Sequence, residues 1–210
     1  MDSIILDLDG TLWDSIDTIA DAWNNVISEN KQTSKRITKD DLRQVMGLPF
    51  DKLGEKLLPE LEKGMRAEII DACCDLENSY LIKQGGILYE NVELTLEILS
   101  RHYKLFIVSN CQDGYIEAFY HYHGLEKYFI DYENPGRTGL SKGENIKLVI
   151  ERNKLVNPVY VGDTAGDQQA AREAGIPFIF AAYGFGEVTD YEYRIDRFDK
   201  LVETMKLIED

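Results

Sequence analysis

The spacing of hydrophobic residues divides the chain into two parts. Residues 3–8 form a short apolar run that predicts a buried strand. Residues 15–84 then carry apolar side chains at helical spacing, and Thr38 with Asp41 forms a capping-box pattern. The helical sets are Ile16, Ile19, Ala20, Trp23, Val26 and Ile27, then Phe50, Leu53, Leu57 and Leu58, then Ile69, Ile70, Cys73, Leu76, Tyr80 and Leu81. This part is therefore predicted to be all-helical.

Beyond about residue 90, short apolar runs alternate with helical patterns. The expected strands are 105–108, a weak one near 128–132, 159–161 and 178–180. The expected helices are 92–101, 113–123, 143–153, 165–174 and 198–208. Such alternation is typical of a parallel sheet with helices on both faces. We predict an α/β fold: a doubly wound, Rossmann-like parallel sheet built from residues 1–14 and 85–210, with residues 15–84 as a helical insert after its first strand.

Composition and charge exclude several classes of protein. The net charge is −15 and no cluster of Lys and Arg is present, which argues against nucleic acid or an anionic membrane as partner. No apolar run reaches the roughly 18 residues that span a bilayer, and the first residues lack the basic region of a signal peptide. We therefore expect a cytoplasmic protein. The three cysteines show no CxxC spacing, which indicates reduced thiols rather than a disulfide framework or a zinc site.

Polar side chains stand where the predicted strands end. In open α/β sheets, ligands bind beyond the carboxyl ends of the strands, so these side chains are expected to converge. Asp7 and Asp9 end the first strand, and Lys142 lies near the start of the helix after the weak strand. The remaining members of the set are Ser109, Asn110, Asp163 and Asp167. No GxGxxG or GxxxxGK motif is present, so a nucleotide-binding site has no motif support.

These residues suit phosphoryl chemistry with a metal. Crowded carboxylates repel one another unless a hard cation lies among them, and oxygen ligands suit Mg²⁺. The cation would also reverse the local charge and let an acidic protein accept an anionic substrate. Asp7 could then attack phosphorus, with Lys142 offsetting charge on the phosphoryl oxygens. Asp9 could protonate the leaving alkoxide and later deprotonate the attacking water.

At these positions the sequence resembles the haloacid dehalogenase superfamily, in its phosphatase branch. Residues 7–12 (Asp-Leu-Asp-Gly-Thr-Leu) resemble the first family motif, Ser109-Asn110 the second, Lys142 the third, and Gly162-Asp163 through Asp167 the fourth. The four occur in the family order, and the resemblance covers essentially the whole chain. Phosphoglycolate phosphatase-like members match the layout best. The resemblance implies that residues 15–84 form a helical cap domain and that residues 1–14 and 85–210 form the catalytic core.

The resemblance also implies a role for each site residue. Asp7 would be the nucleophile and a magnesium ligand, and Asp9 the general acid/base and a ligand through its backbone carbonyl. Lys142 would orient Asp7. The metal set would be completed by Asp163 and by Asp167, directly or through water. The residues expected to bind the substrate are Thr11, Ser109, Asn110 and Gly47, the last in a cap loop, 47–50, that faces the site.

The sequence departs from the family pattern after the third motif. Gly143 follows Lys142, where many relatives have proline, so Lys147 is the alternative lysine. Arg137 has no expected role beyond solvent exposure. Trp13 is expected to line the entrance to the site, whereas His121 and His123 are expected on the helix surface. Hinges of the cap are expected near Asp14–Ser15 and Gln84–Gly86.

The predicted function is magnesium-dependent hydrolysis of a small phosphate monoester through an aspartyl phosphate. Phosphoglycolate and sugar phosphates are the candidate substrates, and the protein is expected as a monomer or homodimer. A phosphomutase of the β-phosphoglucomutase type is the alternative, because the same motifs serve both reactions. Hydrolysis of a carbon–halogen bond would leave Asp9 idle. A binding protein with a decayed site, or a phospho-receiver, fits the intact motifs and the long insert less well.

Overall fold

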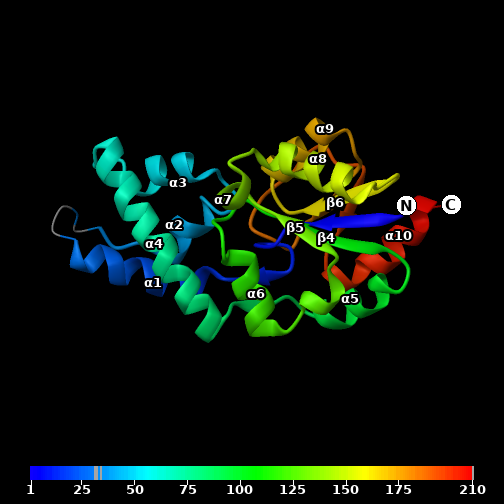
Figure 1. Cartoon of the computed structure of the whole chain (residues 1–210), viewed down its shortest axis with the longest axis horizontal. Coiled ribbons are helices and arrows are strands. Elements are labelled where there is room, and N and C mark those ends of the chain that lie inside the picture. Colours follow the sequence, from blue (N-terminus) through cyan, green and yellow to red (C-terminus); the bar gives the residue numbers. More distant parts are fainter. Residues whose placement is uncertain (31–32, 34, 210) are drawn as a thin grey trace.

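A six-stranded parallel sheet forms the centre of the computed structural model, which describes residues 1–30, 33 and 35–209 (Figure 1). The strand order is β5-β4-β1-β6-β7-β8, and every neighbouring pair is parallel. The strands are β1 (Ser3–Leu6), β4 (Lys104–Val108), β5 (Asp131–Glu133), β6 (Pro158–Gly162), β7 (Phe178–Ala181) and β8 (Tyr193–Ile195). The predicted doubly wound α/β fold is confirmed.

Alternate residues of the strands pack against two separate layers of helices. Ile5, Phe106 and Tyr160 face a core closed by helices α8 and α9. Their neighbours in the strands face the larger core on the other side, toward α5, α6 and α10. These helices are α5 (Val92–Ser100), α6 (Tyr115–His123), α8 (Lys142–Asn153), α9 (Ala165–Ala174) and α10 (Leu201–Glu209). Because strand side chains alternate, one apolar run supplies both layers.

The insert between the first strand and the rest of the sheet is helical, as predicted. It consists of α1 (Ile16–Glu29), α2 (Lys39–Arg43), α3 (Phe50–Leu57) and α4 (Lys63–Gln84). Long helices α1 and α4 pack side by side, and α2 begins with the predicted Thr38–Asp41 capping box. In Figure 1 this bundle lies beside the sheet, at its left. None of the described helices is long and apolar enough to cross a membrane.

Several short elements were not predicted. Strands β2 (Trp13–Asp14) and β3 (Ile87–Leu88) pair antiparallel where the chain leaves the sheet for the insert and returns from it. The weak third strand begins at Asp131 rather than near 128, because a turn of 3₁₀ helix (Glu126–Tyr128) precedes it. The other unpredicted elements are β8, the short helix α7 (Pro135–Thr138) and the 3₁₀ turn Phe198–Lys200 that precedes α10.

Two aromatic residues lie deeper than predicted. Trp13 is fully buried and meets Tyr115 and Phe119 edge-on, so the prediction that it lines the entrance is wrong. His123 meets Trp13 edge-on, and its burial lowers the pKa of the imidazole. It is therefore half-buried rather than a surface residue, whereas His121 is exposed as predicted.

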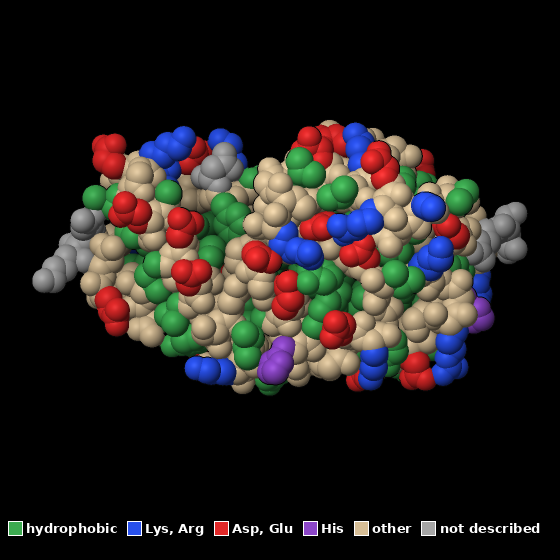
Figure 2. Space-filling model, viewed as in Figure 1, with side chains coloured by type: hydrophobic (Ala, Val, Ile, Leu, Met, Phe, Trp, Pro, Cys, Tyr) green, Lys and Arg blue, Asp and Glu red, His purple; other side chains and the backbone are tan. Residues whose placement is uncertain are grey.

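Charged side chains of both signs are interspersed over the face of the molecule shown in Figure 2. Arg137 is exposed, as predicted, and its guanidinium lies over the ring of Tyr132 and 3.9 Å from the carboxylate of Glu133. It therefore has packing partners that the sequence pattern did not indicate.

Candidate active site

The loop after β1 carries Asp7 and Asp9 and turns tightly around the backbone carbonyl of Leu8. That carbonyl accepts hydrogen bonds from the amides of Thr11, Leu12 and Trp13. Gly10 has a φ of +79°, a conformation that L side chains rarely adopt, and a Cβ there would overlap the carboxylate of Asp163. The glycine thus lets two strand ends approach closely, which brings Asp163 beside Asp7.

Lys142 joins two of the carboxylates. It is the first residue of α8, a position that the Ser141–Glu144 capping box fixes. Its buried ammonium donates to Asp7 Oδ1 at 2.9 Å and to Asp167 Oδ1 at 2.6 Å. Lys147, the alternative lysine, is exposed on the same helix.

Gly143 takes the place of the usual proline without displacing Lys142. A Cβ at Gly143 would lie 2.5 Å from the carboxylate of Glu173. The close packing of α8 on α9 therefore favours glycine at this position.

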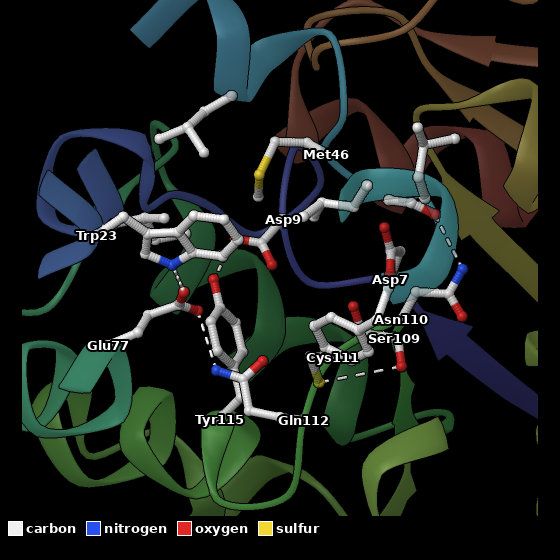
Figure 3. Close-up of a pocket in the computed structure, with 16 residues that line it drawn as sticks. Asp7, Asp9, Trp23, Met46, Glu77, Ser109, Asn110, Cys111, Gln112 and Tyr115 are labelled. Carbon is white, nitrogen blue, oxygen red and sulfur yellow. Dashed lines mark hydrogen bonds between the residues drawn. The ribbon is translucent and has the colours of Figure 1, made fainter. Parts of the chain in front are cut away.

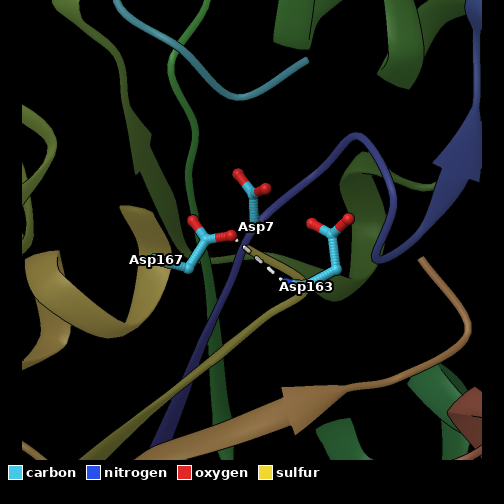
Figure 4. A group of neighbouring side chains, drawn as sticks. All are labelled: Asp7, Asp163 and Asp167. Atoms are coloured by element: carbon cyan, nitrogen blue, oxygen red, sulfur yellow. Dashed lines mark hydrogen bonds between the residues drawn. The ribbon is translucent and has the colours of Figure 1, made fainter. Parts of the chain in front are cut away.

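Three buried carboxylates lie side by side and point in the same direction (Figure 4). Oxygens of Asp7, Asp163 and Asp167 all lie within 4.8 Å of one another. Asp163 Oδ2 accepts a hydrogen bond from the amide of Phe185 at 2.6 Å, whereas its Oδ1 is buried and has no partner among the described residues. One ammonium faces three carboxylates, so the cluster is short of positive charge. This excess of negative charge and the unpartnered oxygen of Asp163 both fit a divalent cation held by oxygen ligands.

Burial and mutual repulsion set the protonation of this cluster. Burial, and then the charge of Asp167, raise the pKa of Asp7 to about 6, although Lys142 and a hydrogen bond from Ser109 act in the opposite direction. The pKa of Asp163 is raised well above its ordinary value for the same reasons. Both shifts follow from burial and from the repulsion between neighbouring carboxylates.

Asp9 has a separate environment. Its Oδ1 accepts hydrogen bonds from the hydroxyls of Ser15 and of Tyr115, the latter at 2.8 Å. The two hydroxyls also lie 2.9 Å apart, so Ser15 and Tyr115 hold each other in place. Burial raises the pKa of Asp9 to about 7. A carboxyl group of this kind can release and accept a proton near neutral pH.

The other predicted residues lie at different depths. Ser109 lines the cavity beside Asp7 and Asp9. The amide of Asn110 donates to the backbone carbonyl of Gly47 at 2.9 Å and so joins the end of β4 to loop 47–50 of the insert. Gly47 lines the same cavity. Thr11 is fully buried behind the loop, and its hydroxyl has no partner within the described part of the chain.

A family model described as "Haloacid dehalogenase-like hydrolase" matches residues 4–181. The chain belongs to this family. This chain is 25% identical to the phosphoglycolate phosphatase of Photobacterium profundum, over 97% of this chain and 95% of that protein. It is 29% identical to the phosphoglycolate phosphatase of Aliivibrio fischeri, over 87% and 84%. These relatives agree with the predicted phosphoglycolate phosphatase-like branch.

Solved structures show the same fold. A haloacid dehalogenase-like hydrolase from Streptococcus pneumoniae superposes with a TM-score of 0.85 at 22% identity, covering 98% of each chain. The structure of CbbY from Rhodobacter sphaeroides in complex with phosphate superposes with a TM-score of 0.80 at 15% identity, covering 96% of each chain. These structures confirm the predicted Rossmann-like core, and the family model confirms the prediction of a hydrolase.

One acidic residue of this hydrolase was not predicted as part of the site. Glu77 of α4 is 4% exposed and lines the cavity that also exposes Asp7 and Asp9 (Figure 3). It falls on the stripe of Ile70, Cys73 and Leu81, which is otherwise apolar. An acidic residue on the buried stripe of a helix is the signal that could have identified it.

Proposed function

We propose that this hydrolase is a magnesium-dependent phosphatase that cleaves a small phosphate monoester through an aspartyl phosphate on Asp7. The observation that carries the proposal is the placement of Asp7 between a buried ammonium and two further carboxylates. The names of the curated relatives, phosphoglycolate phosphatases, support the same reaction class.

Asp7, Asp163 and the backbone carbonyl of Asp9 would hold Mg²⁺. When bound, the ion would offset the charge on the phosphoryl oxygens and on the carboxylates. Asp167 would act on the ion through its charge or through a bridging water, because both its oxygens already accept hydrogen bonds. Its Oδ1 accepts from Lys142, and its Oδ2 from the amide of Thr164 at 2.9 Å.

In the first step a carboxylate oxygen of Asp7 attacks phosphorus, and the bond from phosphorus to the ester oxygen breaks. Lys142 keeps Asp7 oriented and lowers the cost of charge on the phosphoryl group. Asp9 gives its proton to the departing oxygen, which leaves as a neutral alcohol. Ser109 and the amides of the loop after β1 are the proposed hydrogen-bond donors to the phosphoryl oxygens, with Asn110, Thr11 and Gly47 as further candidates for substrate binding.

In the second step Asp9 takes a proton from water, which attacks the phosphoryl group of the aspartyl phosphate. Inorganic phosphate leaves and Asp7 is regenerated. Ser15 and Tyr115 are proposed as positioning residues, because they hold Asp9 on the cavity side of the loop. We propose residues 15–84 as the cap domain that excludes water during the reaction, on a core of residues 1–14 and 85–210, with hinges near Asp14–Ser15 and Gln84–Gly86.

The test is phosphate release from a panel of small phosphate esters, with and without Mg²⁺, by the wild type and Asp7→Asn. We expect release that needs the metal and falls by at least about 10³-fold in the variant, because the amide is a far weaker nucleophile. Asp17→Asn, at an exposed position of α1, is the matched control and should retain full activity. Wild-type release without Mg²⁺, or undiminished release by Asp7→Asn, would contradict the proposal.

Phosphoglycolate and sugar phosphates belong in the ester panel. The same reactions, analysed for isomerised product, would detect a phosphomutase, which the names of the relatives do not favour. A cytoplasmic location and a monomeric or homodimeric state remain predictions.

A further inference from the structure

The cavity beside Asp9 is where the leaving group must lie if the proposed function holds. Asp7 lies at one end of this cavity, and Asp9, the proposed proton donor, lines it as well. Protonation of the ester oxygen requires that oxygen to lie within hydrogen-bond reach of Asp9. The alcohol part of the ester then extends into the space enclosed by α1, α4 and the loop after β4 (Figure 3).

The far wall of this cavity carries an acidic group with neutral partners. Glu77 Oε1 accepts a hydrogen bond from Gln112 Nε2 at 3.0 Å, and Oε2 accepts one from the indole nitrogen of Trp23. Both donors are uncharged, and burial raises the pKa of Glu77 to about 7. A buried carboxylate is costly without a cation beside it, and these hydrogen bonds hold it in place without balancing its charge.

No Lys, Arg or His is among the described residues that line the cavity. Lys142, the buried cation of the site, is already bonded to Asp7 and Asp167. An alcohol that carried a carboxylate, such as glycolate, would therefore bring negative charge toward Glu77 and Asp9 and find no ion-pair partner. Like charges at close range in a buried site repel strongly.

Aromatic rings line the same space. Trp23 contributes its indole from α1, and Tyr115 contributes its phenol ring from α6 (Figure 3). The faces of such rings attract ammonium groups, most strongly for tryptophan. The remaining lining is mostly apolar and includes Ile19, Leu42 and Met46. A carboxylate in a space lined by aromatic rings is a combination that suits a cation.

We propose that the leaving group carries a positive charge, so that the substrate is the phosphate monoester of a small amino alcohol, with Glu77 as its specificity-determining residue. The inference rests on the proposed phosphatase function and narrows its substrate class. The cavity volume of about 40 Å³ limits the alcohol to a few non-hydrogen atoms in this conformation. A two-carbon amino alcohol is the simplest probe of that size.

Three small esters test the proposal. Ethanolamine phosphate, ethyl phosphate and 2-phosphoglycolate each have a phosphate and two carbons, and they differ at the second carbon, which bears an ammonium, is a methyl group or is a carboxylate, respectively. With wild-type protein and Mg²⁺, we expect kcat/KM to fall in that order, by at least about tenfold between the first and the last. A wild type that prefers 2-phosphoglycolate would overturn the inference while supporting the phosphatase function.

The variant Glu77→Gln removes the negative charge of Glu77 and changes little else. Its amide has nearly the same shape, and Gln112 can turn its own amide to keep their hydrogen bond. We expect kcat/KM for ethanolamine phosphate to drop by at least about tenfold, while the value for ethyl phosphate stays within about threefold. An equal loss for both esters would assign Glu77 a structural role and overturn the inference.

The control variant is Glu68→Gln, at an exposed position of α4. It should leave kcat/KM for all three esters unchanged. If the wild type released phosphate from none of the three esters, nor from p-nitrophenyl phosphate, the proposed function and this inference would both fall. Release from p-nitrophenyl phosphate with none from ethanolamine phosphate would overturn only the inference.

Discussion

At the scale of single residues, Asp9 and Glu77 differ in their partners although burial raises both pKa values to about 7. Asp9 accepts from two hydroxyl groups beside the proposed reaction centre, whereas Glu77 accepts from an amide and an indole on the opposite wall. Hydroxyls can reverse their donor role as Asp9 gains and loses a proton, whereas the indole N–H of Trp23 can only donate. The two environments thus suit a proton carrier and a carboxylate held in one position, respectively.

Glu77 should make the stability of the protein depend on pH. Its pKa rises from 4.5 to about 7 on folding, so the native state binds more protons than the unfolded state between those values. The contribution of Glu77 to stability is therefore fully present below pH 4.5 and lost as pH rises through 7. Thermal melts of the metal-free protein should show Glu77→Gln gaining stability over the wild type from pH 5 to pH 8, by on the order of 1 kcal/mol or more.

Glu68→Gln, on the exposed face of the same helix, is the control for this comparison. Its melting temperature should follow that of the wild type at every pH. A Glu77→Gln variant that loses stability by the same amount at pH 5 and pH 8 would contradict the prediction that Glu77 titrates in a buried position.

The strand-end residues could be predicted because they follow directly from local pattern. Asp7, Asp163 and Lys142 stand at the ends of short runs whose periodicity defines strands and helices, and parallel strands share one carboxyl edge. Glu77 and Tyr115 could not be placed in this way, since their positions depend on how the insert packs on the sheet. Trp13 was misplaced for the same reason: its neighbours in space, Phe119 and His123, are distant in sequence.

At the scale of elements, the loop after β1 depends on its glycine. Gly10 combines a left-handed φ with a position against the Asp163 carboxylate, so a side chain there meets two obstacles. Gly124 offers a comparison, because its φ is +67° and a Cβ there would meet nothing within 4 Å. Comparing alanine substitutions at Gly10 and Gly124 therefore distinguishes the effect of backbone strain from that of a clash with Asp163.

Gly124→Ala should cost about 1 kcal/mol of stability and leave activity intact, since only the backbone is strained. Gly10→Ala should cost more stability and lower the rate of phosphate release by at least about 10²-fold, since Asp163 must also move. Denaturant unfolding and initial rates at saturating Mg²⁺ measure the two effects. Equal activity losses in the two variants would show that the Gly10 position has no particular relation to the site.

One helix was predicted with its observed bounds. The predicted range 165–174 is the range Ala165–Ala174 of the structure, where the side chain of Thr164 caps the first turn. Strand β8, by contrast, is three residues long and has only one buried side chain, Ile195. Strands of this kind owe their existence to pairing with a neighbour, here β7, rather than to their own composition.

At the scale of the whole molecule, the site adds to an already large negative charge. The chain carries a net charge of −15, and three carboxylates face one ammonium beneath the insert. Repulsion among these carboxylates destabilises the folded state, and the proposed cation would relieve that repulsion.

Magnesium should raise the melting temperature of the wild type, and Asp163→Asn should behave differently in two respects. Without metal, the variant should melt at a higher temperature, because one repelling charge has been removed. With millimolar Mg²⁺, the melting temperature of the variant should rise little, because a metal stabilises the protein only by binding to the native state. Melts with Mg²⁺ or with a chelator measure both differences.

Asp75→Asn, at an exposed position of α4, should show the same metal-dependent shift as the wild type. A wild type that melts at the same temperature with Mg²⁺ and with chelator would argue against a metal site among these carboxylates.

The antiparallel pair β2–β3 has a consequence for how such a protein can diversify. Trp13 lies opposite Leu88 and Asp14 opposite Ile87, so the chain departs for the insert and comes back at the same place. Everything between these strands can lengthen, shorten or be exchanged while the ends stay a single strand spacing apart. The carboxylates after β1 and β6 would not move. If the proposed function holds, changes in the insert could therefore alter substrate choice while the carboxylates of the sheet keep their positions.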